Sequence, residues 1–387
     1  MRSLTWEQVR RRRLARAFLL EPAPPERLVD VVRAVGGIQA QVLGAAELGI
    51  AVRVASVTRR DVQAELWERR RLVKTWSLRG TLHLHPADEL SLWMAARRAV
   101  TGFRDGRWHE DEGLTKARAR AVLEAIGEAL DGRCLLREEL AEEVARRVGA
   151  WAREPLSSAW GHLIGPAVRT GRLCHGPPRG AKITFVRADQ WLGGFRDDVD
   201  LDAALDDVAR RYLGAFGPAT PEDLVQWFVA PYFGRTEARR IFERLRPELE
   251  EVGVEGRRAF LLAADADEAG APRPEGPPRL LPEYDAYVLG FRERERFIPD
   301  AARARIRAHP KGRFEGPACV PLLIVDGVVA GLWERRRRGK QVEIRVEPLA
   351  PLAARRRRAV ETEAARIARF LGAELSLSFG DVRRLAR

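Results

Sequence analysis

The sequence predicts an α+β protein in which helices followed by a β-hairpin occur three times, before a β-rich segment and a closing helix. Three observations support this prediction. Apolar residues recur at helical spacing in successive blocks, two short alternating runs follow each set of blocks, and the last part of the chain changes to strand-like alternation. With 387 residues, of which 45% are hydrophobic, the chain is long enough for two to four globular modules.

The first repeat is assigned to residues 1–112. Apolar residues have helical spacing at about 6–19, 27–35, 43–53 and 59–70. The stretch that follows, "LVKTWSLRGTLHLHP", alternates polar and apolar positions as two paired strands do. We therefore predict helices that lead into a β-hairpin.

The second repeat, residues 113–198, has the clearest pattern. Helical spacing over 115–130 stops at Asp131-Gly132, a second block over 136–148 stops at Gly149, and a third helix is predicted from Pro155 to Thr170. Two strand-like runs in "RLCHGPPRGAKITFV" then flank a Gly/Pro turn. Three helices followed by a basic hairpin is the order of a winged helix-turn-helix.

The third repeat, residues 199–264, is less distinct. Helical blocks at about 201–214, 221–229 and 235–247 precede two strand runs joined by Glu255-Gly256. We predict three tandem winged helices from this recurring order.

Residues 265–387 form a separate C-terminal region. A Pro/Gly-rich linker, 265–279, precedes three predicted strands at 320–325, 328–333 and 341–347. Asp326-Gly327 predicts a tight hairpin turn, and "ERRRRGK", residues 334–340, predicts a second, basic turn. A helix at about 354–371 is expected to close the chain.

The charge of the chain points to an anionic partner. A formal net charge of +13 makes nucleic acid the first expectation, ahead of a membrane surface. Almost all of the positive charge is arginine, however, and a GC-rich genome produces the same bias. Composition alone therefore leaves DNA binding open.

Several other classes of protein find no support in the sequence. Cys134, Cys174 and Cys319 are too far apart for a disulfide framework or a CxxC metal pattern, which fits a reducing cytoplasm. The first 30 residues make a poor signal peptide, and no run of eighteen apolar residues occurs, so we expect no membrane-spanning segment. The fingerprints of common cofactor enzymes are missing, so we expect no cofactor.

Two glutamines stand out in "GGIQAQ", residues 36–41. Side chains at i and i+2 lie on the same face of an extended segment, whereas in a helix they point in nearly opposite directions. Gly36-Gly37 makes non-helical backbone easy, so Gln39 and Gln41 could converge on one point. The plain alternative is a pair of solvated loop amides.

Basic residues of the predicted hairpins are the candidate DNA contacts. They are Arg79 and His83 in the first hairpin, Arg179 and Lys182 in the second, and Arg335, Arg336, Arg337, Arg338 and Lys340 in the last. Solvation alone would also explain these arginines. His83 and His85 alternate onto one strand face, but spacing suggests no further ligand, so a hydrogen-bonded or DNA-facing histidine is favoured over a metal site.

Four stretches together resemble one family, the bacterial winged-helix DNA glycosylases of the AlkZ and YcaQ type. They are "GGIQAQ", "LVKTWSLRGTLHLHPADE", "LLPEYDAYVLGFRERE" from Leu280 and "PLLIVDGVVAGLW" from Pro321. Their order and spacing span nearly the whole chain, and the combination is far more specific than any single stretch.

The resemblance implies a fold, a partner and a site. It implies three winged helices in a C-shaped arrangement with double-stranded DNA in a basic channel, and a catalytic Gln-aliphatic-Gln motif that maps onto Gln39, Ala40 and Gln41. The YcaQ branch has Asp at the last position, so Gln41 places this chain with the AlkZ branch. That branch removes bulky N7-alkylated purines, unhooks crosslinks and often protects producers of DNA-alkylating compounds. The family's lesion-probing hairpin corresponds to the turn from Glu334 to Gln341.

The chemistry of amides agrees with such a substrate. A neutral amide does not titrate near neutral pH and cannot act as a strong general base, so the leaving group must already be activated. Alkylation at N7 makes the purine cationic and weakens its glycosidic bond. Together with the resemblance, this implies a monofunctional hydrolytic glycosylase that acts on DNA carrying alkylated purines. We also expect a monomer in the cytoplasm.

The main alternative is a non-catalytic winged-helix transcriptional regulator, for which the hairpins and arginines suffice. The predicted helix from Pro155 to Thr170 offers few side chains for reading bases beyond Ser157, Ser158 and His162. An RNA-associated or scaffolding role has less support, because no aromatic platform is evident.

Overall fold

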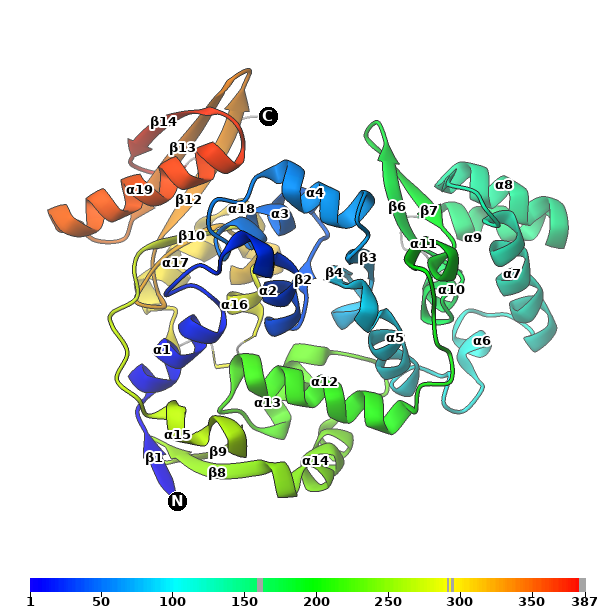
Figure 1. Cartoon of the computed structure of the whole chain (residues 1–387), viewed down its shortest axis with the longest axis horizontal. Helices are drawn as coiled ribbons and strands as arrows, with labels where there is room; N and C mark the ends of the chain where they lie inside the picture. The colour runs from blue at the N-terminus through cyan, green and yellow to red at the C-terminus, as the bar shows by residue number, and fades with distance from the viewer. Residues whose placement is uncertain (159–162, 291, 294–295, 383–387) are drawn as a thin grey trace. The chain divides into compact units, whose positions relative to one another are not determined.

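The computed structural model describes residues 1–158, 163–290, 292–293 and 296–382 (Figure 1). Its contacts form two compact units. Unit 1 comprises Met1–Val62, Arg210–Trp227 and Leu245–Arg387, and unit 2 comprises Gln63–Ala209 and Phe228–Arg244. Each unit combines distant parts of the chain, so the four consecutive regions predicted above describe the order of motifs and not compact bodies.

The N-terminal part of unit 1 contains the first helices and the Gln39 segment. Its elements are β1 (Arg2–Leu4), α1 (Trp6–Arg16), α2 (Leu28–Ala34), β2 (Ile38–Gln39) and α3 (Leu43–Ala51), and α4 (Arg59–Trp67) begins at its end. Helix α1 starts at a capping box, in which Thr5 and Gln8 each accept a hydrogen bond from the other's backbone N–H. The predicted helices are confirmed.

A three-stranded sheet in unit 1 contains the hairpin of the third repeat. Strands β8 (Leu249–Val254) and β9 (Arg257–Leu262) are antiparallel, and Glu255 and Gly256 both have positive φ at the turn, as predicted for a tight hairpin. Strand β1 adds to the sheet parallel to β8. The sequence did not predict this strand, whose Leu4 packs in the apolar core of the sheet.

A five-stranded sheet forms the C-terminal part of unit 1, in the order β10-β11-β12-β13-β14. The strands are β10 (Arg279–Leu281), β11 (Leu322–Val325), β12 (Val328–Arg338), β13 (Gln341–Pro348) and β14 (Glu374–Phe379). Helix α19 (Ala354–Phe370) contacts β10 and β14. The other helices of this part of the chain are α15 (Ala266–Ala269), α16 (Ala286–Leu289), α17 (Asp300–Ala308) and α18 (Pro310–Glu315). Helix α13 (Pro221–Phe228) also belongs to unit 1, except for its last residue. The prediction that a helix closes the chain is wrong, because β14 follows α19 and pairs parallel to β13.

Unit 2 contains two further hairpins. Their strands are β3 (Leu72–Trp76) with β4 (Leu82–Pro86), and β6 (Cys174–Arg179) with β7 (Lys182–Val186). The helices are α5 (Leu90–Ala99), α6 (Trp108–Asp111), α7 (Lys116–Ala129), α8 (Arg137–Val148), α9 (Arg153–Ser157), α10 (Ile164–Arg169), α11 (Ala188–Leu192) and α14 (Arg235–Arg244), and α12 (Leu201–Phe216) starts here and ends in unit 1.

The second repeat has the winged-helix order in full. Strand β5 (Leu135–Leu136) lies between α7 and α8 and pairs with β7, so a three-stranded sheet β5-β7-β6 covers the helices. Leu140, Ile164 and Phe185 are fully buried between helices and sheet. Helices α7 and α8 and the hairpin of β6 and β7 were predicted, whereas β5 was not.

The predicted helix from Pro155 to Thr170 is wrong as one continuous helix. Helix α9 ends at Ser157, because Ser158 has an extended backbone with ψ 135°, and α10 begins only at Ile164. His162 lies outside the described residues. The long recognition helix expected for a regulator is therefore replaced by two short helices at 153–157 and 164–169.

The helices are short throughout. At 17 residues, α19 is the longest helix that the structure describes. Within the described ranges, no helix has both the length and the apolar composition that a membrane span requires.

Candidate active site

Gln39 and Gln41 lie in a short extended segment between α2 and α3. Gly36 and Gly37 end the preceding helix with φ of 71° and 95°, which glycine adopts easily. A Cβ at Gly36 would also lie 3.0 Å from the Trp227 ring, so a larger residue would displace the packing. The non-helical backbone predicted for this segment is confirmed, since Gln39 belongs to β2 and Gln41 precedes α3.

The two glutamines differ in exposure. Gln39 is 7% exposed, Ala40 between them is fully buried, and Gln41 is exposed. The small side chain of Ala40 is therefore enclosed by protein. The amide of Gln39 is buried within unit 1, whereas the amide of Gln41 reaches the solvent, where a macromolecular substrate could contact it.

Helix α3, which starts directly after this segment, is clamped at its C-terminal end by two arginines. Arg53 donates to the carbonyl of Gly49 at 2.8 Å, and Arg366 of α19 donates to the carbonyls of Ala51 and Val52 at 2.6 and 3.1 Å. Positive charges at this end also interact favourably with the helix dipole. The glutamine segment is thus attached to a fixed helix.

A buried ion pair holds this clamp in place. Both side chains of Arg53 and Asp285 are 0% exposed, and two N–O contacts of 2.8 and 2.7 Å join them. Asp285 also caps α16 by accepting the backbone N–H of Tyr287 at 2.9 Å. Sequence reasoning missed this pair, although Asp285 lies in the quoted stretch "LLPEYDAYVLGFRERE"; no local signal connects it to Arg53, 232 residues away.

His83 is a buried support for Arg79 in the first hairpin. Its Nδ1 lies 3.0 Å from the Thr81 carbonyl and must donate there, so its Nε2 accepts from Arg79 at 2.9 Å. Burial, together with the Arg79 cation, lowers the pKa of His83 well below its ordinary value. With 1% exposure His83 cannot contact DNA in this conformation, which corrects the predicted DNA contact and favours the hydrogen-bonded alternative.

Arg79 itself is half-buried at the turn of this hairpin, with a φ of 57°. A positive φ is uncommon for a residue with a side chain and costs free energy. The His83 contact therefore fixes the guanidinium of a residue whose backbone is already constrained.

Arg179 and Lys182 lie opposite each other at the tip of the β6–β7 hairpin. They contact the first turn of α8, where Arg179 is 2.7 Å from Glu139 and Lys182 is 3.6 Å from Glu138. Both side chains are more than half exposed. They remain predicted DNA contacts. A DNA phosphate would have to compete with the carboxylates of Glu139 and Glu138 for these two cations.

The four consecutive arginines lie on a strand and not in a turn. Residues 335–338 continue β12 and pair in register with β13, from Arg335 opposite Ile344 to Arg338 opposite Gln341, so only Gly339-Lys340 forms the turn. The predicted turn from Glu334 to Gln341 is therefore wrong. The strand alternation separates the arginines onto two faces, since Arg335 and Arg337 lie opposite the buried Ile344 and Val342.

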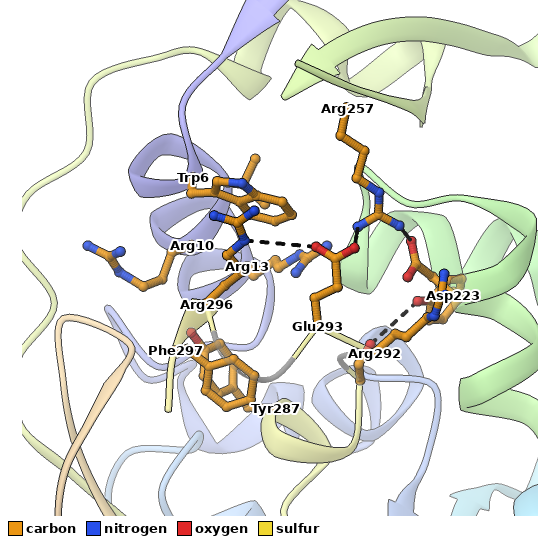
Figure 2. Close-up of a pocket in the computed structure, with 13 residues that line it drawn as sticks. Trp6, Arg10, Arg13, Asp223, Arg257, Tyr287, Arg292, Glu293, Arg296 and Phe297 are labelled. Carbon is orange, nitrogen blue, oxygen red and sulfur yellow. Dashed lines mark hydrogen bonds and ion pairs between the residues drawn. The ribbon is translucent and has the colours of Figure 1, made fainter. Parts of the chain in front are cut away.

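A small cavity in unit 1 is lined by charged residues, as Figure 2 shows. Glu293 forms ion pairs with Arg257 at 3.0 Å and Arg296 at 3.9 Å, and Arg257 also binds Asp223 at 2.6 Å. The cavity volume is about 30 Å³, enough for one to three water molecules but not for a nucleobase. This network joins α13, β9 and the segment after α16, and it is not a substrate site.

Comparisons with known proteins show which family the chain resembles. A family model described as "DNA glycosylase AlkZ-like" matches residues 32–370. An interstrand DNA cross-link repair glycosylase of Streptomyces sahachiroi is 35% identical over 372 residues, which cover 95% of this chain and 97% of that protein. The solved structure of the Streptomyces sahachiroi DNA glycosylase AlkZ matches with a TM-score of 0.81 and 34% identity over 98% of this chain and 100% of the other.

Proposed function

Since this chain belongs to the AlkZ-like DNA glycosylase family, we propose that it hydrolyses the N-glycosidic bond of cationic N7-alkylated purines in double-stranded DNA and leaves an abasic site. We include bulky adducts and interstrand crosslinks, because the Streptomyces relative is named for crosslink repair. The observation that carries the proposal is the extended Gln39-Ala40-Gln41 segment, with one amide buried and one exposed.

The proposed reaction needs no titrating base. The positive charge on an N7-alkylated purine makes the base a good leaving group, and its departure places positive charge on the sugar. The amide oxygens of Gln39 and Gln41 accept hydrogen bonds from a water molecule and hold it below the sugar carbon, while their dipoles face the developing cation. Neither amide is a nucleophile that forms an imine with the sugar, so the product is an abasic site.

The basic hairpins supply phosphate contacts in this proposal. Arg79 is fixed by His83, and the four arginines of β12 lie in the part of that strand, Gly331–Arg338, that pairs with β13. Contacts to phosphate position a protein on DNA without reading its sequence. Sequence-tolerant binding is what a repair enzyme requires, and it distinguishes this function from that of a sequence-specific regulator.

A base-release assay tests the proposal. Duplex DNA with a single N7-methylguanine is incubated with the protein, the freed base is measured by mass spectrometry, and abasic sites are measured by alkali cleavage. We expect release by the wild type, and Gln41→Ala should lower the rate by about 10²-fold with little change in DNA affinity. Gln226→Ala, at an exposed position of α13, is the matched control.

Equal loss of DNA binding and base release in Gln41→Ala would indicate a structural role for this glutamine. A footprint at one specific sequence, without base release, would favour a regulator. We also propose that the protein acts as a monomer in the cytoplasm, and sedimentation tests the oligomeric state. We further propose that it can protect a cell that makes a DNA-alkylating compound, which a survival assay tests.

A further inference from the structure

The start of helix α3 carries an exposed apolar side chain directly after Gln41. Val42 is 41% exposed, whereas every residue of the helix from Ala45 to Ala51 is buried. Helix α3 is therefore embedded in unit 1, and its N-terminal end reaches the surface beside Gln41. No step of the mechanism above uses Val42.

Val42 is a poor residue for the position that it occupies. It is the N-cap of α3, with an extended backbone at φ −112° and ψ 105°, and its side chain forms no capping hydrogen bond. Serine, threonine, aspartate and asparagine are preferred at an N-cap because their oxygens accept the first N–H groups of the helix, whereas valine is among the least favoured residues. Helix capping therefore does not explain an exposed valine at this position.

Gly44, in the first turn of α3, is also unfavourable for the helix. Its backbone is helical, and a Cβ built there would meet none of the described residues within 4 Å, its immediate neighbours aside. Glycine in a helix costs stability relative to alanine, and it is used where a ligand or another backbone must approach closely. The open space beside Gly44 therefore suits the close approach of another molecule.

Both unfavourable residues lie next to the glutamine that we propose as catalytic. Violations of local preference without a structural gain are expected at functional sites. Arg53 and Arg366 fix the other end of α3, so Val42 is presented on a rigid support. A β-branched side chain has few rotamers, so Val42 loses little entropy when it makes a contact.

The chemistry of the proposed substrate indicates what Val42 contacts. N7 of guanine faces the major groove, so a bulky alkyl group on N7 occupies that groove. The sugar carbon is then accessible from the minor-groove side, where Gln41 would hold its water molecule. Consecutive Cα atoms are about 3.8 Å apart, close to the spacing of about 3.4 Å between stacked base pairs. Val42 therefore reaches the damaged nucleotide or the next base step.

We propose that Val42 is a wedge that enters the minor groove beside the damaged nucleotide and unstacks the neighbouring base step, while Gly44 leaves room for the sugar–phosphate strand. Proteins that bind the minor groove often insert apolar side chains between base steps. Unstacking loosens the damaged nucleotide and opens its sugar carbon to the water held by Gln41. Valine forms no hydrogen bonds to base edges, so the wedge tolerates any sequence. This inference rests on the proposed glycosylase function.

A fluorescent base reports the unstacking directly. The adenine analogue 2-aminopurine, which is quenched when stacked, is placed on either side of a single N7-methylguanine in duplex DNA, and a 2′-fluoro sugar keeps the glycosidic bond intact. We expect saturating wild-type protein to raise the fluorescence on one side. The rise should be lost in Val42→Ser and retained in Val42→Ile. Val229→Ser changes a valine of similar exposure, 45%, in unit 2, and as the matched control it should also retain the rise.

Base release and thermal unfolding supply two further readouts. With a natural sugar, Val42→Ser should lower the single-turnover rate of base release about tenfold, as expected for the lost contact of two methyl groups. Gly44→Gln fills the open space and should lower this rate as well. Both variants should keep or raise the melting temperature, because serine is a preferred N-cap and glutamine is a better helix former than glycine.

The outcomes separate the wedge from the proposed function. A wild type that leaves 2-aminopurine stacked, a rise that survives Val42→Ser, or melting temperatures that fall in both variants would overturn the inference. Base release that is unchanged in Val42→Ser and Gly44→Gln would remove the wedge and keep the glycosylase. Unstacking that depends on Val42, without base release, would keep the wedge and remove the proposed reaction.

Discussion

The hairpin of β12 and β13 allows a quantitative prediction about DNA binding. Among the described residues, the side chains of Arg336 and Lys340 form no hydrogen bond or ion pair, so both are available for phosphate. The other three cations are engaged: Arg335 lies over Trp333 and is 22% exposed, Arg337 donates to the Leu371 carbonyl at 2.8 Å, and Arg338 pairs with Glu343 at 3.1 Å. The double variant Arg336→Ala/Lys340→Ala should therefore remove two phosphate contacts.

The expected magnitude follows from counterion release. Each phosphate contact contributes about 0.9 to the slope of log affinity against log salt, so the double variant should lower the slope by about 1.8. At 0.15 M salt the same term predicts an affinity about thirtyfold lower. Arg335→Ala should change the slope little, because its guanidinium is paired with Glu283.

Fluorescence anisotropy with a labelled duplex, measured from 0.05 to 0.3 M salt, gives both slopes. Unmodified and N7-methylguanine duplexes should show the same change, since phosphate contacts carry no base information. An unchanged slope in the double variant, or an equal change in Arg335→Ala, would refute the assignment of contacts.

Three further predictions concern stability and pH. Asp285→Ala leaves Arg53 charged and buried, so the free energy of unfolding measured in urea should fall by about 3–5 kcal/mol. A change below about 1 kcal/mol would contradict the role of this ion pair in holding α3. Burial lowers the pKa values of His83 and His175 well below normal, so below about pH 6.5 the unfolded chain binds more protons than the folded one. The free energy of unfolding should therefore fall as the pH drops, by up to about 1.4 kcal/mol per pH unit for each histidine. Identical melting curves at pH 7 and pH 5 would contradict this. Because Gln41 does not titrate, release of N7-methylguanine should stay level between about pH 6.5 and 8, and a bell-shaped profile would indicate a separate acid or base.

Local sequence determined much of the fold. The Gly36-Gly37 pair, the helical blocks around it and the turns at Glu255-Gly256 and Asp326-Gly327 all depend on backbone preferences of a few adjacent residues. The extended geometry of Gln39 and Gln41 could therefore be predicted, and the resemblance supplied the role that we propose for them.

The errors have a different origin. The four arginines from Arg335 look like a solvated turn, because nothing nearby shows that β13 continues to pair with them or that β14 supports β13 from the other side. The strand β1 likewise exists only because β8 is available to pair with Leu4. Pairing between distant strands overrides the local tendency of a charged run to form a loop.

The long-range contacts around the candidate site were decided by tertiary structure. Arg53 meets Asp285 across 232 residues, and His83 turns inward to hold Arg79. Burial and long-range contact set the charge state and direction of each group, and no residue's neighbours in sequence carry that information. The sequence by itself determined which side chains could take part in chemistry. Folding decided which of them are buried, held in place and oriented, because desolvation depends on everything packed around a group and not on its position in the chain.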